Sequence, residues 1–226
     1  MAEHHPPLAV RVCGDFACFT RPEMKVERVT YPVMTPSAAR GVLEAIFWKP
    51  QFTWRIEEIR VLEPVRYFSI LRNEVNSRVS ERVAASWAQT NGGYDASTDR
   101  AQRHTLALRD VAYVIRAHVD VRPGVADDPA KYRDQFRRRV ADGRCFATPY
   151  LGCREFSADF GEVRENEPAI PWTEDLGPML LDLEYAADGS GRGTPRFFNA
   201  RIVEGVLRTP VSPFTNGEAH AATTTT

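Results

Sequence analysis

The sequence contains no long hydrophobic run and few cysteines, and each of these shortages excludes a class of protein. No stretch approaches the roughly 18 uncharged apolar residues that a membrane-spanning helix requires. Residues 1–10 lack the apolar segment of a secretory signal. We therefore expect a cytoplasmic protein that does not enter a membrane and keeps its thiols reduced.

Patterns that would hold a metal or a cofactor are also missing. The four cysteines, Cys13, Cys18, Cys145 and Cys153, contain no C-x-x-C pair that would indicate zinc or thioredoxin-like chemistry. The acidic residues are scattered, without a pair spaced to hold catalytic magnesium. The glycine-rich residues 189–193 lack the lysine and the following helix of a phosphate-binding loop. The sequence thus predicts a protein that works without a metal or a cofactor.

Lysine occurs only at Lys25, Lys49 and Lys131, so most of the 29 basic side chains are arginine. The formal net charge of −1 does not by itself indicate a nucleic-acid partner. A guanidinium group, however, can grip a phosphate through two hydrogen bonds and stack on a base, which suits RNA. A solvated surface balanced by the 30 acidic residues remains the alternative. The residues predicted to bind RNA are Arg60, Arg66, Arg72, Arg78, Arg103, His104, Arg109, Arg137 and Arg138.

The spacing of apolar residues predicts two helices among several strands. Apolar residues alternate in the strands and recur every three or four positions in the helices. Thr35 with Pro36, and Asp128 with Pro129, supply the N-cap and the first turn of the two helices. The polar, arginine-rich residues 72–108 show neither period and predict a loop or a flexible hairpin. The predicted elements are a strand over residues 8–19, a helix over 36–48, one long strand over 56–70 bent near Pro64, a strand over 110–122, a helix over 128–143 and an extended segment over 145–151.

This order of elements is the split βαβ arrangement of ferredoxin-like domains. We therefore predict an α+β fold with a ferredoxin-like, or RRM-like, βαββαβ domain over residues 1–160, whose sheet has one helix-covered face and one open face. The remaining residues, 161–226, predict a small C-terminal antiparallel β domain. Its expected parts are a strand over residues 179–185, a flexible loop over 189–193, a hairpin of residues 197–203 and 206–209 that turns at Glu204 and Gly205, and a disordered tail over 221–226.

Arg116 and His118 form the pattern that suggests catalysis. They lie two residues apart on the polar face of the 110–122 strand, so both side chains point the same way, roughly 7 Å apart. Histidine can take a proton from a ribose 2′-hydroxyl or give one to the leaving 5′-oxygen. Arginine can neutralise the phosphorane that forms between these steps. A solvated strand face with an ordinary surface histidine remains the alternative.

Several stretches together resemble the CRISPR-associated Cas5 proteins of subtype I-C, also called the Dvulg or d type. A helix that ends in IFWKP and a strand that ends in an Ala-His pair are the most specific of them. The stretches are residues 10–19 (VRVCGDFACF), 35–50 (TPSAARGVLEAIFWKP), 113–119 (YVIRAHV), 150–160 (YLGCREFSADF), 179–185 and 195–210 (PRFFNARIVEGVLRTP).

The resemblance implies a metal-independent endoribonuclease that cuts the repeat hairpin of precursor CRISPR RNA and stays on the 5′ handle of the mature crRNA. It also implies that the other subunits of a subtype I-C Cascade complex are partners. Members of the family are similar in using a tyrosine, a lysine and a histidine to activate the 2′-hydroxyl, which leaves a cyclic phosphate. His118 matches the histidine, whereas the tyrosine position is Phe47 here and the neighbouring cation is Arg116. Tyr31 is one residue that could supply the missing hydroxyl.

Two other functions stay open. A non-catalytic subunit of the same complex, which binds crRNA and double-stranded DNA, is the alternative that Phe47 motivates, because phenylalanine cannot donate a proton. A small-molecule enzyme on a ferredoxin-like scaffold is the other, because a fold alone does not determine function.

Overall fold

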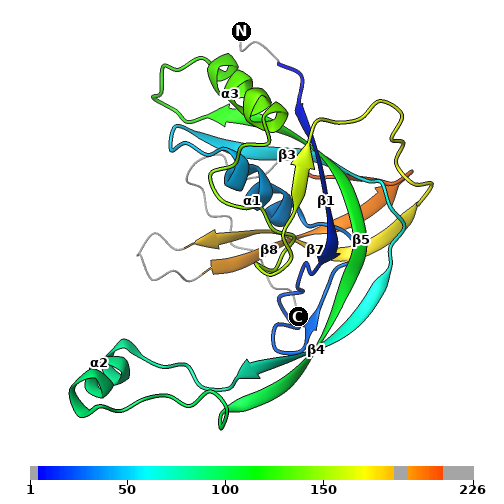
Figure 1. Cartoon of the computed structure of the whole chain (residues 1–226). Coiled ribbons are helices and arrows are strands. Elements are labelled where there is room, and N and C mark those ends of the chain that lie inside the picture. Colours follow the sequence, from blue (N-terminus) through cyan, green and yellow to red (C-terminus); the bar gives the residue numbers. More distant parts are fainter. Residues whose placement is uncertain (1–4, 186–192, 211–226) are drawn as a thin grey trace, which may run out of the picture.

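The computed structural model describes residues 5–185 and 193–210, in which nine strands form one curved sheet (Figure 1). Most of the predicted loop 189–193 and the whole predicted tail 221–226 lie outside these residues. The strand order is β6-β1-β5-β3-β9-β8-β7, and both β2 and β4 also pair with β5. The elements are β1 (Leu8–Ala17), β2 (Arg28–Val29), α1 (Pro36–Ile46), β3 (Phe52–Val61), β4 (Tyr67–Val75), α2 (Glu81–Thr90), β5 (Arg100–Val121), α3 (Pro129–Ala141), β6 (Asp159–Gly161), β7 (Glu174–Tyr185), β8 (Gly193–Val203) and β9 (Val206–Arg208).

The hydrophobic core lies between the sheet and helices α1 and α3. Alternate residues of β1 and β5, among them Val10, Val12, Tyr113 and Ile115, are buried in one cluster with the apolar side chains of both helices. Helix α1 contacts β3 and β7, and α3 contacts β5 and β6. Within residues 5–185 and 193–210, no helix covers the other face of the central strands, and the predicted combination of helices with a mainly antiparallel sheet is confirmed.

Both predicted helices are confirmed, and their caps explain where they begin. The Thr35 side chain accepts a hydrogen bond from the Ala38 amide, and the Asp128 side chain accepts one from the Ala130 amide. Helix α1 ends at Phe47, which is already extended. No helix in the two described stretches is both long and apolar enough to cross a membrane.

The predicted long strand over residues 56–70 is wrong, because two strands, β3 and β4, occupy this region. Both pair antiparallel with β5, which is 22 residues long and serves as their shared neighbour. The break falls around Pro64, which has no amide hydrogen to donate to a ladder. Within β5, Asp110 has a positive φ of 53° between the segment that pairs with β4 and the segment that pairs with β3.

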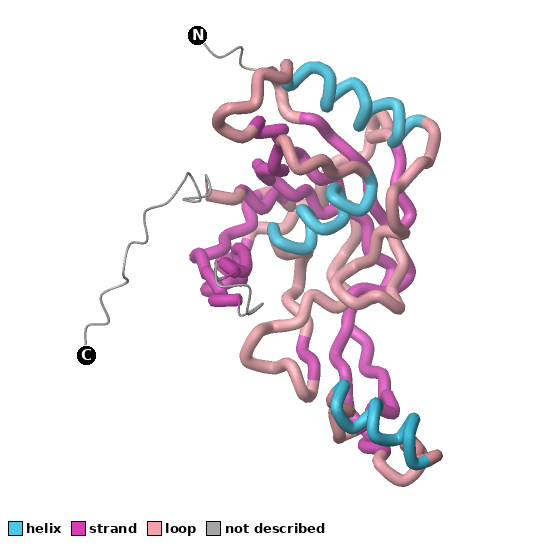
Figure 2. Tube along the Cα trace, turned by 90° about the vertical axis from the view of Figure 1, so that its left-hand side faces the viewer, coloured by secondary structure: helices cyan, strands magenta, loops and turns pink. Residues whose placement is uncertain are grey.

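Of the two alternatives predicted for residues 72–108, a loop or a flexible hairpin, the structure has a hairpin, and it adds a helix, α2, that the sequence did not predict. Strand β4 and residues 100–107 of β5 form a two-stranded ladder, and helix α2 lies in the connection at its outer end. Figures 1 and 2 show this arm, defined here as residues 67–107, projecting from the body of the molecule. Exposed and half-buried residues alternate along β4, but apolar side chains such as Ile70 and Leu71 lie on both of its faces, so the sequence shows no apolar period there.

A second correction concerns residues 145–151, which do not form a strand. The Phe146 and Ala147 amides donate to the Ala45 carbonyl instead, and Tyr150 makes a single bridge to Ser157. The strand that pairs with the outer side of β1 is β6, only three residues long.

The C-terminal strands continue the same sheet. Residues 206–208 of β9 pair with residues 58–60 of β3, and β8 then links β9 to β7. The predicted hairpin between β8 and β9 is confirmed, with positive φ at Glu204 and Gly205. A side chain at Gly205 would come within 2.4 Å of the Ile170 carbonyl, so this turn requires glycine.

Candidate active site

Arg116 and His118 lie on the open face of β5. Their neighbours Ile115, Ala117 and Val119 point into the core beneath the helices. The Arg116 and His118 side chains point the opposite way and remain 32% and 17% exposed. The structure therefore brings the two residues together on a face that a ligand can approach.

A bulge in β3 brings a carboxylate to His118. Ile56 pairs with Ala117 and Glu58 pairs with Arg116, which leaves Glu57 as an extra residue between them. The Glu57 Oε2 atom lies 2.5 Å from His118 Nε2. Sequence reasoning missed Glu57, because two adjacent glutamates give no local signal of a bulge.

Glu58 gathers three arginines beside this pair. Its carboxylate is 3% exposed and lies 2.8 Å from Arg60 Nε, 3.4 Å from Arg116 Nη1 and 3.5 Å from Arg208 Nη1. Three guanidinium groups around one carboxylate leave an excess of positive charge next to His118. An anion such as a phosphodiester is the ligand that this excess favours. Arg208 comes from β9 and was not among the predicted RNA-binding residues.

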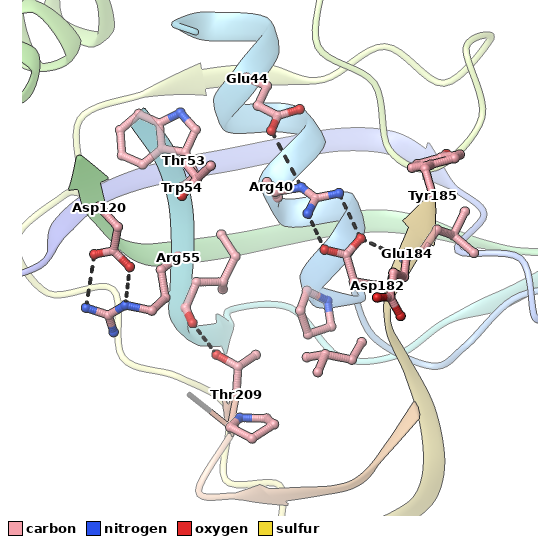
Figure 3. Close-up of a pocket in the computed structure, with 15 residues that line it drawn as sticks. Arg40, Glu44, Thr53, Trp54, Arg55, Asp120, Asp182, Glu184, Tyr185 and Thr209 are labelled. Atoms are coloured by element: carbon pink, nitrogen blue, oxygen red, sulfur yellow. Dashed lines mark hydrogen bonds and ion pairs between the residues drawn. The ribbon is translucent and has the colours of Figure 1, made fainter. Parts of the chain in front are cut away.

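A cavity of about 410 Å³ lies beside this site, between α1, β3 and β7 (Figure 3). Its charged groups are paired with one another: Arg40 binds Asp182 and lies 3.5 Å from Glu44, and Arg55 Nε lies 2.7 Å from Asp120 Oδ2. Burial raises the pKa of the Glu44 carboxyl. Because its two arginines face four carboxylates, those of Glu44, Asp120, Asp182 and Glu184, the cavity attracts a phosphate less than the arginines around Glu58 do.

The structure places Phe47 and Tyr31 away from His118. Phe47 is 2% exposed and packs in the core on the helix-covered side of the sheet, 5.6 Å from the Phe52 ring. Tyr31 is 1% exposed, and its hydroxyl accepts a hydrogen bond from the Leu180 amide. Burial raises the pKa of Tyr31, so it is a poor proton donor or base near neutral pH.

The predicted RNA-binding residues do not form one patch. Arg60 is the one next to His118, through Glu58. Many of the others have a carboxylate within reach, as in the pairs Arg66 with Asp110 and Arg137 with Asp134. Those on the arm are Arg72, Arg78, Arg103 and His104, those at its base are Arg66 and Arg109, and those on α3 are Arg137 and Arg138.

No group of three or more histidine, cysteine or acidic side chains within the described ranges is arranged to hold a metal ion. The groups that the open face brings together around His118 include the carboxylates of Glu57 and Glu58 and the guanidinium groups of Arg60, Arg116 and Arg208.

Comparison with known proteins places the chain in a family. The model of a CRISPR-associated protein family (Cas_Cas5), of the Cas5d type, matches residues 8–210. Two relatives are named CRISPR pre-crRNA endoribonuclease Cas5d. The one from Mannheimia succiniciproducens is 42% identical over 90% of this chain and 94% of its own length. The one from Thermus thermophilus is 44% identical over 92% of this chain and 93% of its own length.

Solved structures agree on the fold. A crystal structure of a CRISPR-associated protein matches with a TM-score of 0.64 at 22% identity, and covers 92% of this chain and 95% of that one. A functionally uncharacterized protein, SMU1763c from Streptococcus mutans, matches with the same TM-score of 0.64 at 22% identity, and covers 90% of this chain and 92% of that one. The chain belongs to the Cas5d family of CRISPR-associated proteins.

Proposed function

We propose that this chain is a metal-independent endoribonuclease that cleaves the repeat hairpin of precursor CRISPR RNA and then stays on the 5′ handle of the crRNA. The observation that carries the proposal is an imidazole held by a carboxylate, beside clustered guanidinium groups, on an open sheet face. The names of the two relatives support precursor CRISPR RNA as the substrate.

His118 is the general acid and base of the proposed reaction. Its ring accepts the proton of the ribose 2′-hydroxyl while the 2′-oxygen forms a bond to phosphorus. The bond from phosphorus to the 5′-oxygen then breaks, and that oxygen takes a proton from the imidazolium. The products are a 2′,3′-cyclic phosphate and a 5′-hydroxyl. The reaction consumes no water, and the scheme uses no metal ion.

Arg116 stabilises the pentacoordinate phosphorane in this scheme. Its guanidinium group lies on the same face of β5 as His118. Arg60 and Arg208 bind the same carboxylate as Arg116, that of Glu58, and so add positive charge near the phosphate. Charge that is already oriented towards the reacting phosphate needs no rearrangement when the transition state forms.

The arginines of the arm and of α3 support a longer path for the RNA. Arg78, Arg103 and His104 extend along the arm, and Arg137 and Arg138 lie along α3. We assign these residues to backbone contacts that hold the hairpin and the 5′ handle, with the other subunits of a subtype I-C Cascade complex as protein partners. The site of action is the cytoplasm.

Within this proposal, β1, α1, β3, β5, α3 and β6 form a ferredoxin-like, RRM-like unit. The strand order β6-β1-β5-β3 and the antiparallel pairing of these strands support that assignment. The division into an RNA-processing domain over residues 1–160 and a second unit over residues 161–226 stays a prediction.

A cleavage assay on repeat RNA in EDTA tests the function. We expect the parent to cut once per hairpin, and His118→Ala to be slower by about 10² to 10⁴-fold, the usual contribution of general acid–base catalysis. Val83→Ala is the control, because it shortens an exposed apolar side chain on α2 that has no assigned role in binding or chemistry, and it should cleave as fast as the parent. His118→Ala cleaving as fast as the parent would refute the assignment.

A non-catalytic subunit that binds crRNA or double-stranded DNA is the second candidate function. The observation that favours it is Phe47, which has no hydroxyl and is buried in the core. In the same assay, tight binding of repeat RNA by the parent without strand scission would select this function.

A further inference from the structure

We infer that Glu57 is a positioning residue for His118, which holds the ring through Nε2 and leaves Nδ1 as the atom that exchanges protons with the RNA. The inference rests on the proposed function and adds to it the orientation and the tautomer of the imidazole. It starts from the distance of 2.5 Å between Glu57 Oε2 and His118 Nε2.

The hydrogen bond determines the tautomer. An ionised carboxylate only accepts hydrogen bonds, and a neutral imidazole carries one N–H. The Nε2 atom must therefore carry the hydrogen, and the Nδ1 lone pair is free to act as a base. Among the residues that the structure describes, no other group is bonded to this ring. The logic is that of catalytic triads, in which an acceptor on one ring nitrogen prepares the other for proton transfer.

The backbone is built to present Glu57. Ile56 and Ile59 are buried in the core, while Glu58 faces the open side. In a regular strand one residue lies between two residues that point to the same face. Here two residues, Glu57 and Glu58, lie between Ile56 and Ile59, so the bulge adds the Glu57 carboxylate to the open face. Thr209 holds the bulge in place, because its amide donates to the Glu57 carbonyl at 2.9 Å and its hydroxyl donates to the Ile56 carbonyl at 2.5 Å. Figure 3 shows Thr209 bonded to the strand at this point.

The surrounding charges leave Glu57 available for this task. The charged groups near His118 on the open face are Arg55, Glu57, Glu58 and Arg60 from β3, Arg116 and Asp120 from β5, and Arg208 from β9. Glu58 is bound by three arginines and Asp120 is bound by Arg55. Within the described part of the chain, Glu57 has no arginine or lysine partner, and its carboxylate is committed to His118 alone.

Single-turnover cleavage of repeat RNA separates a positioning role from a structural one. We expect Glu57→Gln to lower the rate about 10- to 100-fold, the effect that metal-ligating histidines show when the hydrogen-bond partner of their other ring nitrogen is lost. The dissociation constant for RNA should change less than about twofold, because binding depends on the arginines. Glu57→Asp keeps the charge and should recover part of the rate. Asp120→Asn is the matched control: it removes a carboxylate from the same face that does not touch His118, and should cleave as fast as the parent.

Proton NMR of the free protein supplies a readout that does not depend on cleavage. We expect a downfield ring N–H signal from His118 on Nε2 in the parent, retained in Glu57→Asp and lost in Glu57→Gln. A proton found on Nδ1, or full cleavage by a folded Glu57→Gln variant, would overturn the inference while His118→Ala remains inactive. If the parent does not cleave RNA at all, the proposed function fails instead, and the NMR signal still decides whether Glu57 positions the ring. Should Glu57→Gln fail to fold, Glu57→Asp decides: a retained Nε2–H signal with a rate below that of Asp120→Asn supports the role, and a rate equal to that of Asp120→Asn contradicts it.

Discussion

At the scale of single residues, the open face shows why arginine rather than lysine is used. One planar guanidinium group from each of β3, β5 and β9 reaches the same buried carboxylate of Glu58. A carboxylate that is 3% exposed needs such partners, because an unpaired buried charge is strongly destabilising. Each of these guanidinium groups also has N–H donors that do not bond to Glu58 and can bind a phosphate. The three arginines therefore stabilise the buried carboxylate and also provide the anion-binding site.

Cys153 gives a prediction about pH at this scale. A hydrogen bond from the Cys18 thiol, assisted by Arg28 Nη1 at 3.4 Å, lowers the pKa of Cys153 to about 6, whereas an unfolded cysteine titrates near 8.5. The folded thiolate therefore stabilises the protein fully above the unfolded pKa, and this contribution is lost as the pH falls through about 6. The same hydrogen bond raises the pKa of Cys18, which opposes the gain at higher pH.

We expect the difference in Tm between the parent and Cys153→Ser to widen as the pH rises from about 6 to about 8.5. Thermal unfolding followed by circular dichroism across this window measures it. Cys145→Ser is the control, because Cys145 is exposed and its substitution should shift Tm equally little at every pH. A constant difference between parent and Cys153→Ser would mean that Cys153 is not a thiolate in the folded protein.

Single-residue patterns predicted part of the candidate site. Alternation along residues 110–122 was enough to put Arg116 and His118 on one face, because a strand has a fixed period of two. It could not predict Glu57, since a bulge breaks that period and depends on Thr209, about 150 residues away, for its hydrogen bonds. The arginines around Glu58 were predicted only in part, because Arg208 arrives through the pairing of β9 with β3.

At the scale of elements, the arm gives the next prediction. The Asn76 amide donates to the Asp99 carbonyl at 3.1 Å, so the two strands are still paired where α2 and its loops begin. We expect an Asn-Gly turn in place of residues 77–98 to close the hairpin and to change Tm by less than about 3 °C, because α2 buries no side chain.

RNA binding should respond to the same change. The replacement removes Arg78 and Arg82, so we expect a weaker affinity for repeat RNA and a shallower dependence of log Kd on log salt concentration, by about 0.7 for each lost phosphate contact. Fluorescence anisotropy at several salt concentrations measures both quantities. An unchanged Kd and an unchanged slope would place the tip of the arm outside the RNA path.

Elements with a strong local signal were predicted well. Helices α1 and α3 begin at their predicted caps, because a side-chain acceptor followed by proline determines the first turn. Helix α2 was not predicted because none of its residues is buried, and the strands of the arm gave no apolar period because apolar side chains such as Ile70 and Leu71 lie on both their half-buried and their exposed faces. The prediction of an extended segment over residues 145–151 was wrong for the opposite reason. The segment is apolar, but the outer side of β1 pairs with β6 instead.

At the scale of the whole molecule, the sequence predicts two domains, whereas the sheet runs without a break from β6 to β7. Met179, Ile202 and Leu207 from the C-terminal strands are buried in the same cluster as Val42 and Leu43 of α1. Two units that share one core cannot lose their packing independently, because exposing either side removes apolar contacts from the other.

We therefore expect the chain to unfold in one cooperative transition, with fluorescence and circular dichroism giving the same midpoint. Leu207→Ala should move that single transition, with a loss of about 2 to 4 kcal/mol of unfolding free energy, because Leu207 is fully buried between β3 and β8. Val83→Ala on the exposed α2 is the control and should leave the midpoint nearly unchanged. Two separate transitions, of which Leu207→Ala moves only one, would show that the C-terminal strands fold as a unit of their own and would restore the division near residue 160. In that case Arg208 and Thr209 would be able to leave the candidate site while β5 stays folded, and the orientation of His118 would depend on whether the C-terminal unit is docked.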